Sequence, residues 1–353
     1  MMQKFRTRVV AFGILAFTLL AVSTAATFGT DTNKDGVLTA EEARANRREI
    51  RKERDRSEAE EGREPTLRDV RYGPYLRNLL DFYQARSDKP TPLLICFHGG
   101  GFVGGDKYHY ANNELLKKCL ESGISVVSAN YRFIRPKDGE PGYPFPAPML
   151  DGARTIQFVR SKAQEWNIDP PRVALTGGSA GACMSIWLAV HDDLTNPASE
   201  DPIEQQSTRV SCAIGYEGQT TLIPEEILKN IGGNPTIHPS LLPLYGVESM
   251  EDLKQPKIQE LMHEATALNH VSRGDPPLYL KYGGKLAGTP LPPETSIGVS
   301  IHHAMFGKLM QDKYQALGLE CTLSANDVPA EESEWEFLYR HMGLKAKEQS
   351  GQP

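Results

Sequence analysis

Six short apolar runs, rich in β-branched residues, recur along the chain, and stretches with helical periodicity separate most of them. The runs cover residues 92–97, 124–129, 172–176, 210–215, 278–282 and 319–323. The helical stretches cover residues 113–122, 149–166, 180–191 and 304–317. Strands that alternate with helices in this way form parallel sheets whose two faces are both covered. The pattern predicts an α/β domain over residues 67–346, with a mostly parallel sheet and helices on both faces.

A longer segment, residues 219–277, stands between the fourth and fifth of these runs. It is rich in proline, mostly helical in pattern and longer than a simple crossover requires. Ligands of α/β proteins bind at the carboxyl ends of the strands. We expect this insertion to form a helical cap over that edge of the sheet.

Composition places the chain among ordinary globular proteins and excludes several functions. Of the 353 residues, 39% are hydrophobic and 24% are charged, as in typical globular domains. The net charge of -6 offers nothing that attracts nucleic acid, so we expect no nucleic-acid partner. The five scattered cysteines fit neither a disulfide scaffold nor a cysteine-rich zinc site.

The N-terminus has the pattern of an export signal. Three basic residues precede an apolar run over residues 9–22, and small residues follow at 23–26. This order is typical of a signal peptide with its cleavage site. We predict a signal peptide over residues 1–25 and a secreted or periplasmic protein with no stable membrane span after cleavage. The alternative is an uncleaved apolar run that reaches residue 28 and anchors the N-terminus in the membrane.

Residues 31–42 read DTNKDGVLTAEE and match the EF-hand loop at each diagnostic position. The calcium ligands would be the side chains of Asp31, Asn33, Asp35 and Glu42 and the carbonyl of Val37. Few residues would precede the loop after cleavage, too few for an entering helix. We predict a half EF-hand over residues 26–45 that binds Ca²⁺ weakly as a local structural clip, with a degenerate loop as the alternative. Residues 46–66 are mostly charged and predict a solvated helical linker.

The sequence Gly177-Gly-Ser179-Ala-Gly181 lies between a predicted strand and a predicted helix. A G-x-S-x-G motif in this setting is typical of a nucleophile elbow, a strained turn that exposes the serine hydroxyl at the start of a helix. Upstream, the run 92–97 leads directly into His98 and three glycines. Glycines there let backbone N–H groups point into the site, where they would stabilise the oxyanion of a tetrahedral intermediate.

Together the two motifs resemble those of the α/β-hydrolase superfamily, in particular the HGGG carboxylesterases related to hormone-sensitive lipase and to the bifunctional acetylxylan/feruloyl esterases. The resemblance covers about residues 67–344 and implies an α/β-hydrolase fold. It also implies that Ser179 is the acyl nucleophile and that Gly100, Gly101 and Ala180 form the oxyanion hole. By the same resemblance His98 is structural.

The other members of a catalytic triad are absent from the positions that the family uses. The family places an acid after the penultimate strand and a histidine after the last strand. In this chain no carboxylate follows the run 278–282 until Glu294, and His341 is the one histidine after the run 319–323. A serine hydroxyl needs a base to be a good nucleophile near neutral pH, so this absence bears directly on activity.

Two neighbouring histidines and two carboxylates are candidates for the missing roles. His302 and His303 lie near the place of the family's acid loop, and either could turn toward Ser179 as the base. Glu217, just after the run 210–215, is a candidate for the acid that orients the base, and Glu294 is the runner-up. The sequence leaves these assignments open.

Two functions follow from these observations. The first is an exported serine hydrolase that cleaves carboxylic esters through an acyl-enzyme, needs no cofactor for catalysis, and acts on a small-molecule or carbohydrate ester, such as acyl groups on a polysaccharide. The second is a catalytically impaired hydrolase fold that binds a ligand beneath its cap. The two motifs favour the first function, and the empty triad positions favour the second.

Overall fold

The computed structural model describes residues 63–111, 113–137, 139–233, 238 and 240–344. The predicted signal peptide, the calcium loop and the linker up to residue 62 lie outside the described residues. Their sequence-based assignments therefore stay predictions. Within the described part of the chain, no helix combines the length and apolar character needed to cross a membrane.

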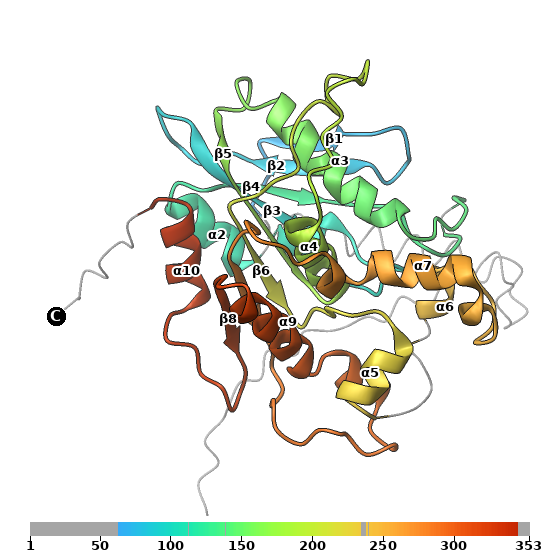
Figure 1. The fold of residues 1–353 in the computed structure, drawn as a ribbon. Coiled ribbons are helices and arrows are strands. Elements are labelled where there is room, and N and C mark those ends of the chain that lie inside the picture. The colour runs from blue at the N-terminus through green and yellow to red at the C-terminus, as the bar shows by residue number, and fades with distance from the viewer. Residues whose placement is uncertain (1–62, 112, 138, 234–237, 239, 345–353) are drawn as a thin grey trace, which may run out of the picture. The chain divides into compact units, whose positions relative to one another are not determined.

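Eight strands form one sheet in the order β1-β2-β4-β3-β5-β6-β7-β8 (Figure 1). β1 pairs with β2, and β2 with β4, in antiparallel fashion, and the other neighbours are parallel. The strands are β1 (Leu67–Arg71), β2 (Leu79–Tyr83), β3 (Thr91–Phe97), β4 (Ser125–Ala129), β5 (Ile168–Gly178), β6 (Cys212–Tyr216), β7 (Leu278–Lys281) and β8 (Cys321–Ser324). The six predicted strands correspond to β3–β8, and the mostly parallel sheet confirms the predicted fold class.

The sequence did not predict β1 and β2, because an aspartate interrupts each of them. Asp81 lies in the middle of β2 and is fully buried, and Lys107 neutralises it through a 2.7 Å contact between Nζ and Oδ2. Asp69 in β1 also contacts the Lys107 ammonium at 2.7 Å. A buried carboxylate is tolerated when a cation pairs with it, and here that cation comes from a distant part of the sequence.

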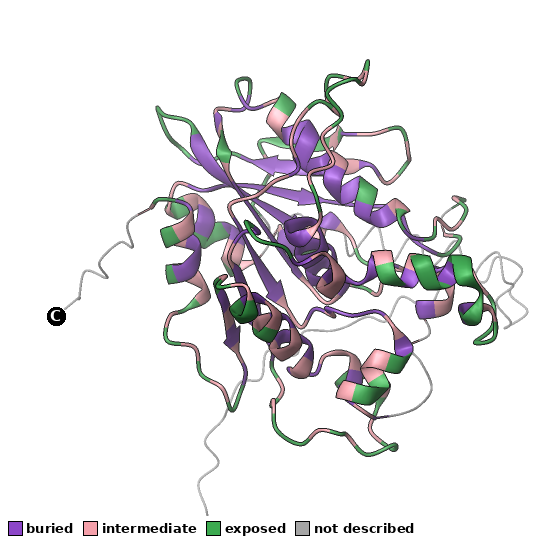
Figure 2. Ribbon diagram, in the orientation of Figure 1, coloured by how far each residue is buried: buried purple, intermediate pink, exposed green. Residues whose placement is uncertain are grey.

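Helices cover both faces of the sheet, as the two-sided burial of β3 requires. Side chains alternate between the faces along a strand, so Leu93, Ile95 and Phe97 pack into the core that contains residues of α3 and α4. Leu94 and Cys96 pack into the opposite core, together with residues of α2 and α10. The helices are α2 (Glu114–Glu121), α3 (Ala147–Ser161), α4 (Ala180–Val190), α9 (Met305–Ala316) and α10 (Glu334–His341). Figure 2 shows the buried strands between these helical layers.

The helix α4 is buried along its entire length. Its sequence, AGACMSIWLAV, has no charged residue and is apolar on all sides, which is typical of a helix enclosed by other elements. This burial holds the start of α4, and therefore the turn that precedes it, in a rigid part of the fold.

The insertion between β6 and β7 is helical, as predicted. It contains α5 (Pro224–Asn230), α6 (Leu241–Leu244), η2 (Asp252–Lys254), α7 (Pro256–Ala265) and η3 (Ala267–His270). The N–H of Phe145 donates to the Leu244 carbonyl at 2.7 Å and joins the insertion to the segment before α3. Two further elements complete the described chain, η1 (Lys107–Tyr110) and α8 (Ile297–Ile301).

Candidate active site

Ser179 lies at the sharp junction between β5 and α4, with φ of 52° and ψ of -117°. This left-handed backbone conformation is strained for a residue with a side chain and is typical of a nucleophile elbow. Two hydrogen bonds hold the turn in place. The Ser179 N–H donates to the Tyr216 carbonyl at 2.8 Å, and the Ser179 carbonyl accepts from the Cys183 N–H at 2.8 Å.

The glycines on either side of the serine are required by close backbone contacts. A Cβ on Gly181 would lie 2.0 Å from the carbonyl oxygen of Phe97, at the end of β3. A Cβ on Gly177 would lie 2.4 Å from the carbonyl carbon of Gly181. Real Cβ atoms do not approach backbone this closely, so the turn packs directly against the end of β3 only because these positions lack side chains.

The glycine loop that follows β3 lies against the serine turn. A Cβ on Gly99 would be 2.9 Å from the carbonyl oxygen of Gly178 and 3.6 Å from the Ser179 Cβ. The Gly100 carbonyl accepts the N–H groups of Val103 and Gly104 at 3.0 and 3.1 Å. Because a trans peptide points its N–H away from its C=O, the N–H of Gly101 points in the opposite direction.

Gly100, Gly101 and Ala180 line the same cavity as Ser179. Ala180 is the first residue of α4, so its N–H has no partner within the helix. The fold therefore brings the two backbone segments that contain the proposed oxyanion-hole residues to the same cavity.

His98 supports this loop from behind as a neutral side chain. Its Nε2 accepts from the Arg77 guanidinium at 3.3 Å, so its Nδ1–H donates to the Gly99 carbonyl at 2.8 Å. Burial lowers the pKa of His98 to about 4. The Tyr131 hydroxyl donates to the His98 carbonyl at 2.6 Å, and the two rings stack with centroids 4.3 Å apart. These contacts fit the structural role expected for His98.

The structure brings His302 to the serine, with 3.0 Å between His302 Nε2 and Ser179 Oγ. His302 follows α8, in the long segment after β7. The side-chain amide of Gln219, just after β6, donates to the carbonyl of Ile301. The Thr220 hydroxyl donates to the Phe306 carbonyl at 2.7 Å. Hydrogen bonds on both sides of His302 thus fix it relative to the sheet.

His303 occupies a different environment although it is adjacent in sequence. Its ring is buried, and its Nδ1 accepts the Met305 N–H at 3.1 Å at the start of α9. Burial lowers the pKa of His303. Across the described residues His303 makes no hydrogen bond to Ser179, so of the two candidate bases only His302 reaches the serine hydroxyl.

The candidate acids do not reach His302. Glu217 has a φ of 56°, and its Oε1 accepts the N–H of Gly283 at 3.2 Å. Glu294 is exposed. His341 lies at the end of α10, where its Nε2 is 3.3 Å from Glu320. In the portions of the chain that the structure describes, no carboxylate forms a hydrogen bond with His302.

The serine and the histidine open into a cavity of about 430 Å³. The insertion supplies half of the lining residues, namely Gln219, Leu222, Ile227, His238, Ser240, Leu241 and Leu244. A cavity of this size fits a small ligand, and its leucine and isoleucine side chains suit an apolar acyl group.

His238 lies in the wall of this cavity, and no motif in the sequence indicates a role for it. Its Nδ1 accepts the Ser240 N–H at 3.1 Å. Burial lowers the pKa of His238, and the nearby His302 contributes to this shift. No local motif could have pointed to His238, because the folding of the insertion over the glycine loop creates its position.

A protein-family model, BD-FAE, matches residues 80–289, more than half of the chain. Two curated proteins of Mycobacterium tuberculosis are similar in sequence. "Probable carboxylic ester hydrolase LipM" is 28% identical over 221 residues, which make up 61% of this chain and 47% of that protein. "Esterase LipQ" is 28% identical over 223 residues, 62% of this chain and 48% of that protein. The chain therefore spans about half the length of these relatives.

Solved structures share the fold. An acetyl ester-xyloside bifunctional hydrolase from Caldicellulosiruptor lactoaceticus is 24% identical, with a TM-score of 0.53 over 72% of this chain and 79% of that chain. A truncated carbohydrate esterase from gut microbiota is 16% identical, with a TM-score of 0.59 over 80% of this chain and 100% of that chain. Esterase Est2 of Thermogutta terrifontis is 18% identical, with a TM-score of 0.52 over 77% of this chain and 87% of that chain. At these identities the likeness shows the fold alone, which is that of α/β-hydrolase esterases.

Proposed function

Because the chain belongs to the BD-FAE family of α/β-hydrolase esterase domains, we propose that it is a serine hydrolase that cleaves carboxylic esters. The 3.0 Å contact between Ser179 Oγ and His302 Nε2 carries this proposal. This contact provides His302 as the base, whereas the sequence has no histidine at the position that the family uses, after the last strand. The alternative of an impaired fold rested on the empty acid and base positions of the triad. His302 takes the place of the base, no carboxylate among the described residues takes the place of the acid, and the relatives do not support the alternative.

In the proposed mechanism, His302 Nε2 takes the proton from the Ser179 hydroxyl as the oxygen attacks the ester carbonyl carbon. The N–H groups of Gly101 and Ala180 stabilise the resulting oxyanion, a contribution of about 3–4 kcal/mol for each donor. His302 then gives its proton to the leaving alcohol, and an acyl-enzyme on Ser179 is formed. His302 then takes a proton from water as the water oxygen attacks the acyl carbon. The bond between that carbon and Ser179 Oγ breaks, His302 returns the proton to Ser179 Oγ, and the acid product leaves.

The proposed catalytic pair is a serine and a histidine whose orientation depends on backbone contacts. Gln219 takes part by donating to the carbonyl next to His302. In other serine hydrolases a carboxylate holds the base in the required orientation. Here the hydrogen bonds of Gln219 and Thr220 to the segment around His302 would serve that purpose.

We further propose that the substrate is a small acyl ester, with acyl groups on a polysaccharide as the leading candidate. The 430 Å³ cavity suits an acetyl-sized or somewhat larger acid. The names of two structural neighbours, an acetyl ester-xyloside hydrolase and a carbohydrate esterase, favour a carbohydrate alcohol. We also propose export by the N-terminal signal, because a secreted enzyme would meet such polymers. Calcium binding at residues 31–42 is a separate part of the proposal.

Labelling with a fluorophosphonate tests the proposal, because this reagent reacts appreciably only with an activated serine. We expect rapid labelling of Ser179 in the full chain and none in Ser179→Ala. His302→Asn should lower the labelling rate and the hydrolysis of p-nitrophenyl acetate by about 10²-fold or more.

His303→Asn is the matched control, since it removes the neighbouring ring, which forms no hydrogen bond to the serine. It should keep most of the rate, provided that circular dichroism shows both variants folded. Equal rates in His302→Asn and the unaltered chain would refute the assignment of the base. A folded chain that is not labelled at all would refute the hydrolase itself.

A further inference from the structure

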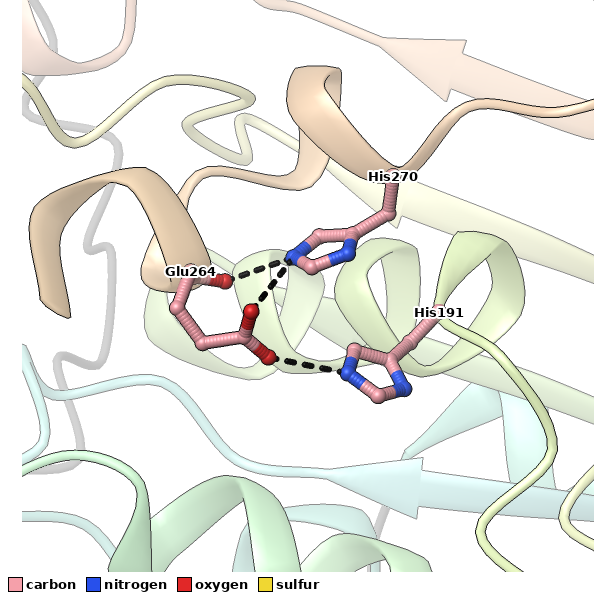
Figure 3. Close-up of side chains that lie close together, drawn as sticks. All are labelled: His191, Glu264 and His270. Carbon is pink, nitrogen blue, oxygen red and sulfur yellow. Dashed lines mark hydrogen bonds and ion pairs between the residues drawn. The ribbon is translucent and has the colours of Figure 1, made fainter. Parts of the chain in front are cut away.

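Two histidines and a glutamate converge at a place that the proposed chemistry does not use. His191 follows the last residue of α4, Glu264 lies in the last turn of α7, and His270 ends η3. One ligand atom from each residue lies within 4.8 Å of the others. Figure 3 shows the two neighbouring imidazole rings, which both face the glutamate carboxylate. The cluster therefore joins the end of the nucleophile helix to the end of the insertion.

The hydrogen bonds of His191 direct a lone pair at the carboxylate. Its Nδ1 is 2.9 Å from the Asp192 carbonyl, which can only accept, so Nδ1 carries the proton. In the neutral ring Nε2 then has a lone pair, and it faces Glu264 Oε1 at 3.0 Å. Two acceptors at this distance need a positive charge between them, which is either a proton or a metal ion. Histidine ligands in proteins are commonly oriented by such an Nδ1–H bond to a carbonyl.

His270 can turn its Nε2 into a ligand without leaving a buried group unsatisfied. This atom is 2.6 Å from the main-chain carbonyl of Glu264 and 3.9 Å from its carboxylate. The same carbonyl also accepts the indole N–H of Trp187 at 2.9 Å. In the observed position Nε2–H donates to this carbonyl, which can only accept. A turn of the His270 ring away from the carbonyl, with the proton on Nδ1, would free the Nε2 lone pair, and the carbonyl would keep the Trp187 donor.

The donor set is that of a zinc-class ion. Two imidazole nitrogens and one carboxylate are ligands of Zn²⁺, and three protein ligands leave one position for water. Ligand atoms around a tetrahedral Zn²⁺ are about 3.3 Å apart, close to the 3.0 Å between His191 and Glu264. The Glu264 side chain is 47% exposed, so it can move to close the wider distance to His270.

Apolar packing shields the histidine side of the cluster. The Trp187 indole is buried and lies 4.1 Å from the His191 ring and 5.8 Å from the His270 ring, measured between centroids. The His191 and His270 side chains are 14% and 15% exposed, whereas the carboxylate is open to solvent. An ion can therefore enter from the Glu264 side and meet two nearly enclosed nitrogens.

We propose that His191, Glu264 and His270 form a binding site for a divalent transition metal of the zinc class. The bound ion ties α7 and η3 of the insertion to the C-terminal end of α4. Its function is structural, since it stabilises the cap against the core. The site shares no residue with the cavity around Ser179, so the proposal stands independently of the esterase function.

The test is titration of Zn²⁺ into the full chain after treatment with EDTA, in a buffer with excess Ca²⁺ to occupy residues 31–42. We expect one Zn²⁺ per chain, a raised unfolding temperature and, with Co²⁺ as the probe, the intense visible absorption of tetrahedral coordination. Glu264→Gln and His270→Gln preserve hydrogen-bonding shape and should weaken Zn²⁺ binding by about 100-fold or more, at least as much as loss of an outer-shell partner. The same titration in Ser179→Ala should be unchanged.

His263→Gln is the matched control, because His263 precedes Glu264 on the same helix and is exposed outside the cluster. It should bind Zn²⁺ like the unaltered chain. Unfolding temperatures in EDTA check that each variant is folded. The proposal is overturned if the unaltered chain binds no Zn²⁺ at micromolar concentrations. It is also overturned if Glu264→Gln and His270→Gln bind as tightly as His263→Gln.

Discussion

The substitution Gly99→Ala tests whether the glycine loop and the serine turn must touch for the reaction to proceed. The new Cβ would lie 2.9 Å from the Gly178 carbonyl oxygen, whereas ordinary contact begins at 3.4 Å. The loop must therefore move by about half an ångström away from Ser179, and it takes the N–H of Gly101 with it. Since a displacement of about 1 Å can cost 10²-fold in rate, we expect kcat for p-nitrophenyl acetate to fall about tenfold, or ~1.4 kcal/mol in the barrier.

Gly178→Ala provides the control for Gly99→Ala. Gly178 precedes the nucleophile directly, yet a Cβ there meets no atom within 4 Å. We expect kcat to change less than about twofold, because nothing has to move. Both variants are measured for kcat and KM and for urea unfolding, where Gly99→Ala should lose about 1–3 kcal/mol. Equal kcat values for the two variants would refute the argument that contact between the loop and the turn sets the oxyanion geometry.

Three further outcomes are expected. Asp151→Asn leaves the buried Arg132 guanidinium without its 2.7 Å carboxylate partner. It should lower the unfolding free energy in a urea titration by ~3–5 kcal/mol. Glu251→Gln, which removes one charge of an exposed ion pair, should change it by less than ~1 kcal/mol. Because the pKa of His98 is about 4 rather than 6.5, the unfolded chain binds an extra proton between these values. The free energy of unfolding should therefore fall by ~3 kcal/mol through this group as the pH falls from 6.5 to 4. An unchanged free energy of unfolding in denaturant titrations across that range would contradict the burial of a neutral ring. Ca²⁺ should shift the unfolding temperature of the hydrolase domain little, because the loop 31–42 precedes it, and a rise of several degrees in calorimetry would contradict the clip interpretation.

The sequence predicts those parts of the fold whose cause is local. β3 and β4 are buried at every position, and β5 is buried over residues 173–177, as expected for strands of a parallel sheet that is covered on both faces. β1 is mostly exposed, and β2 contains the buried Asp81, which Lys107 of η1, 26 residues away, neutralises, so neither strand has this pattern. The sequence of a strand does not show that a distant residue will neutralise a charge within it, so such a strand cannot be predicted from its local pattern.

The same difference separates the two halves of the candidate site. The serine turn and the glycine loop depend on small residues at fixed spacing, so their motifs reveal them. The base depends on which of two adjacent histidines turns toward Ser179. Two hydrogen bonds determine which histidine it is: the Gln219 side chain donates to the carbonyl of Ile301, and the Met305 N–H donates to the ring of His303. Neither contact has a recognisable sequence pattern.

The segments that line the cavity all follow four neighbouring strands, β3, β5, β6 and β7. β8, at the outer edge of the sheet, contributes none of the described lining residues. The edge of the sheet at β8, together with α10, is therefore a suitable side of the molecule for engineering. A surface linkage for immobilisation, or a fused carbohydrate-binding module, can be attached there without altering the described residues that line the cavity around Ser179.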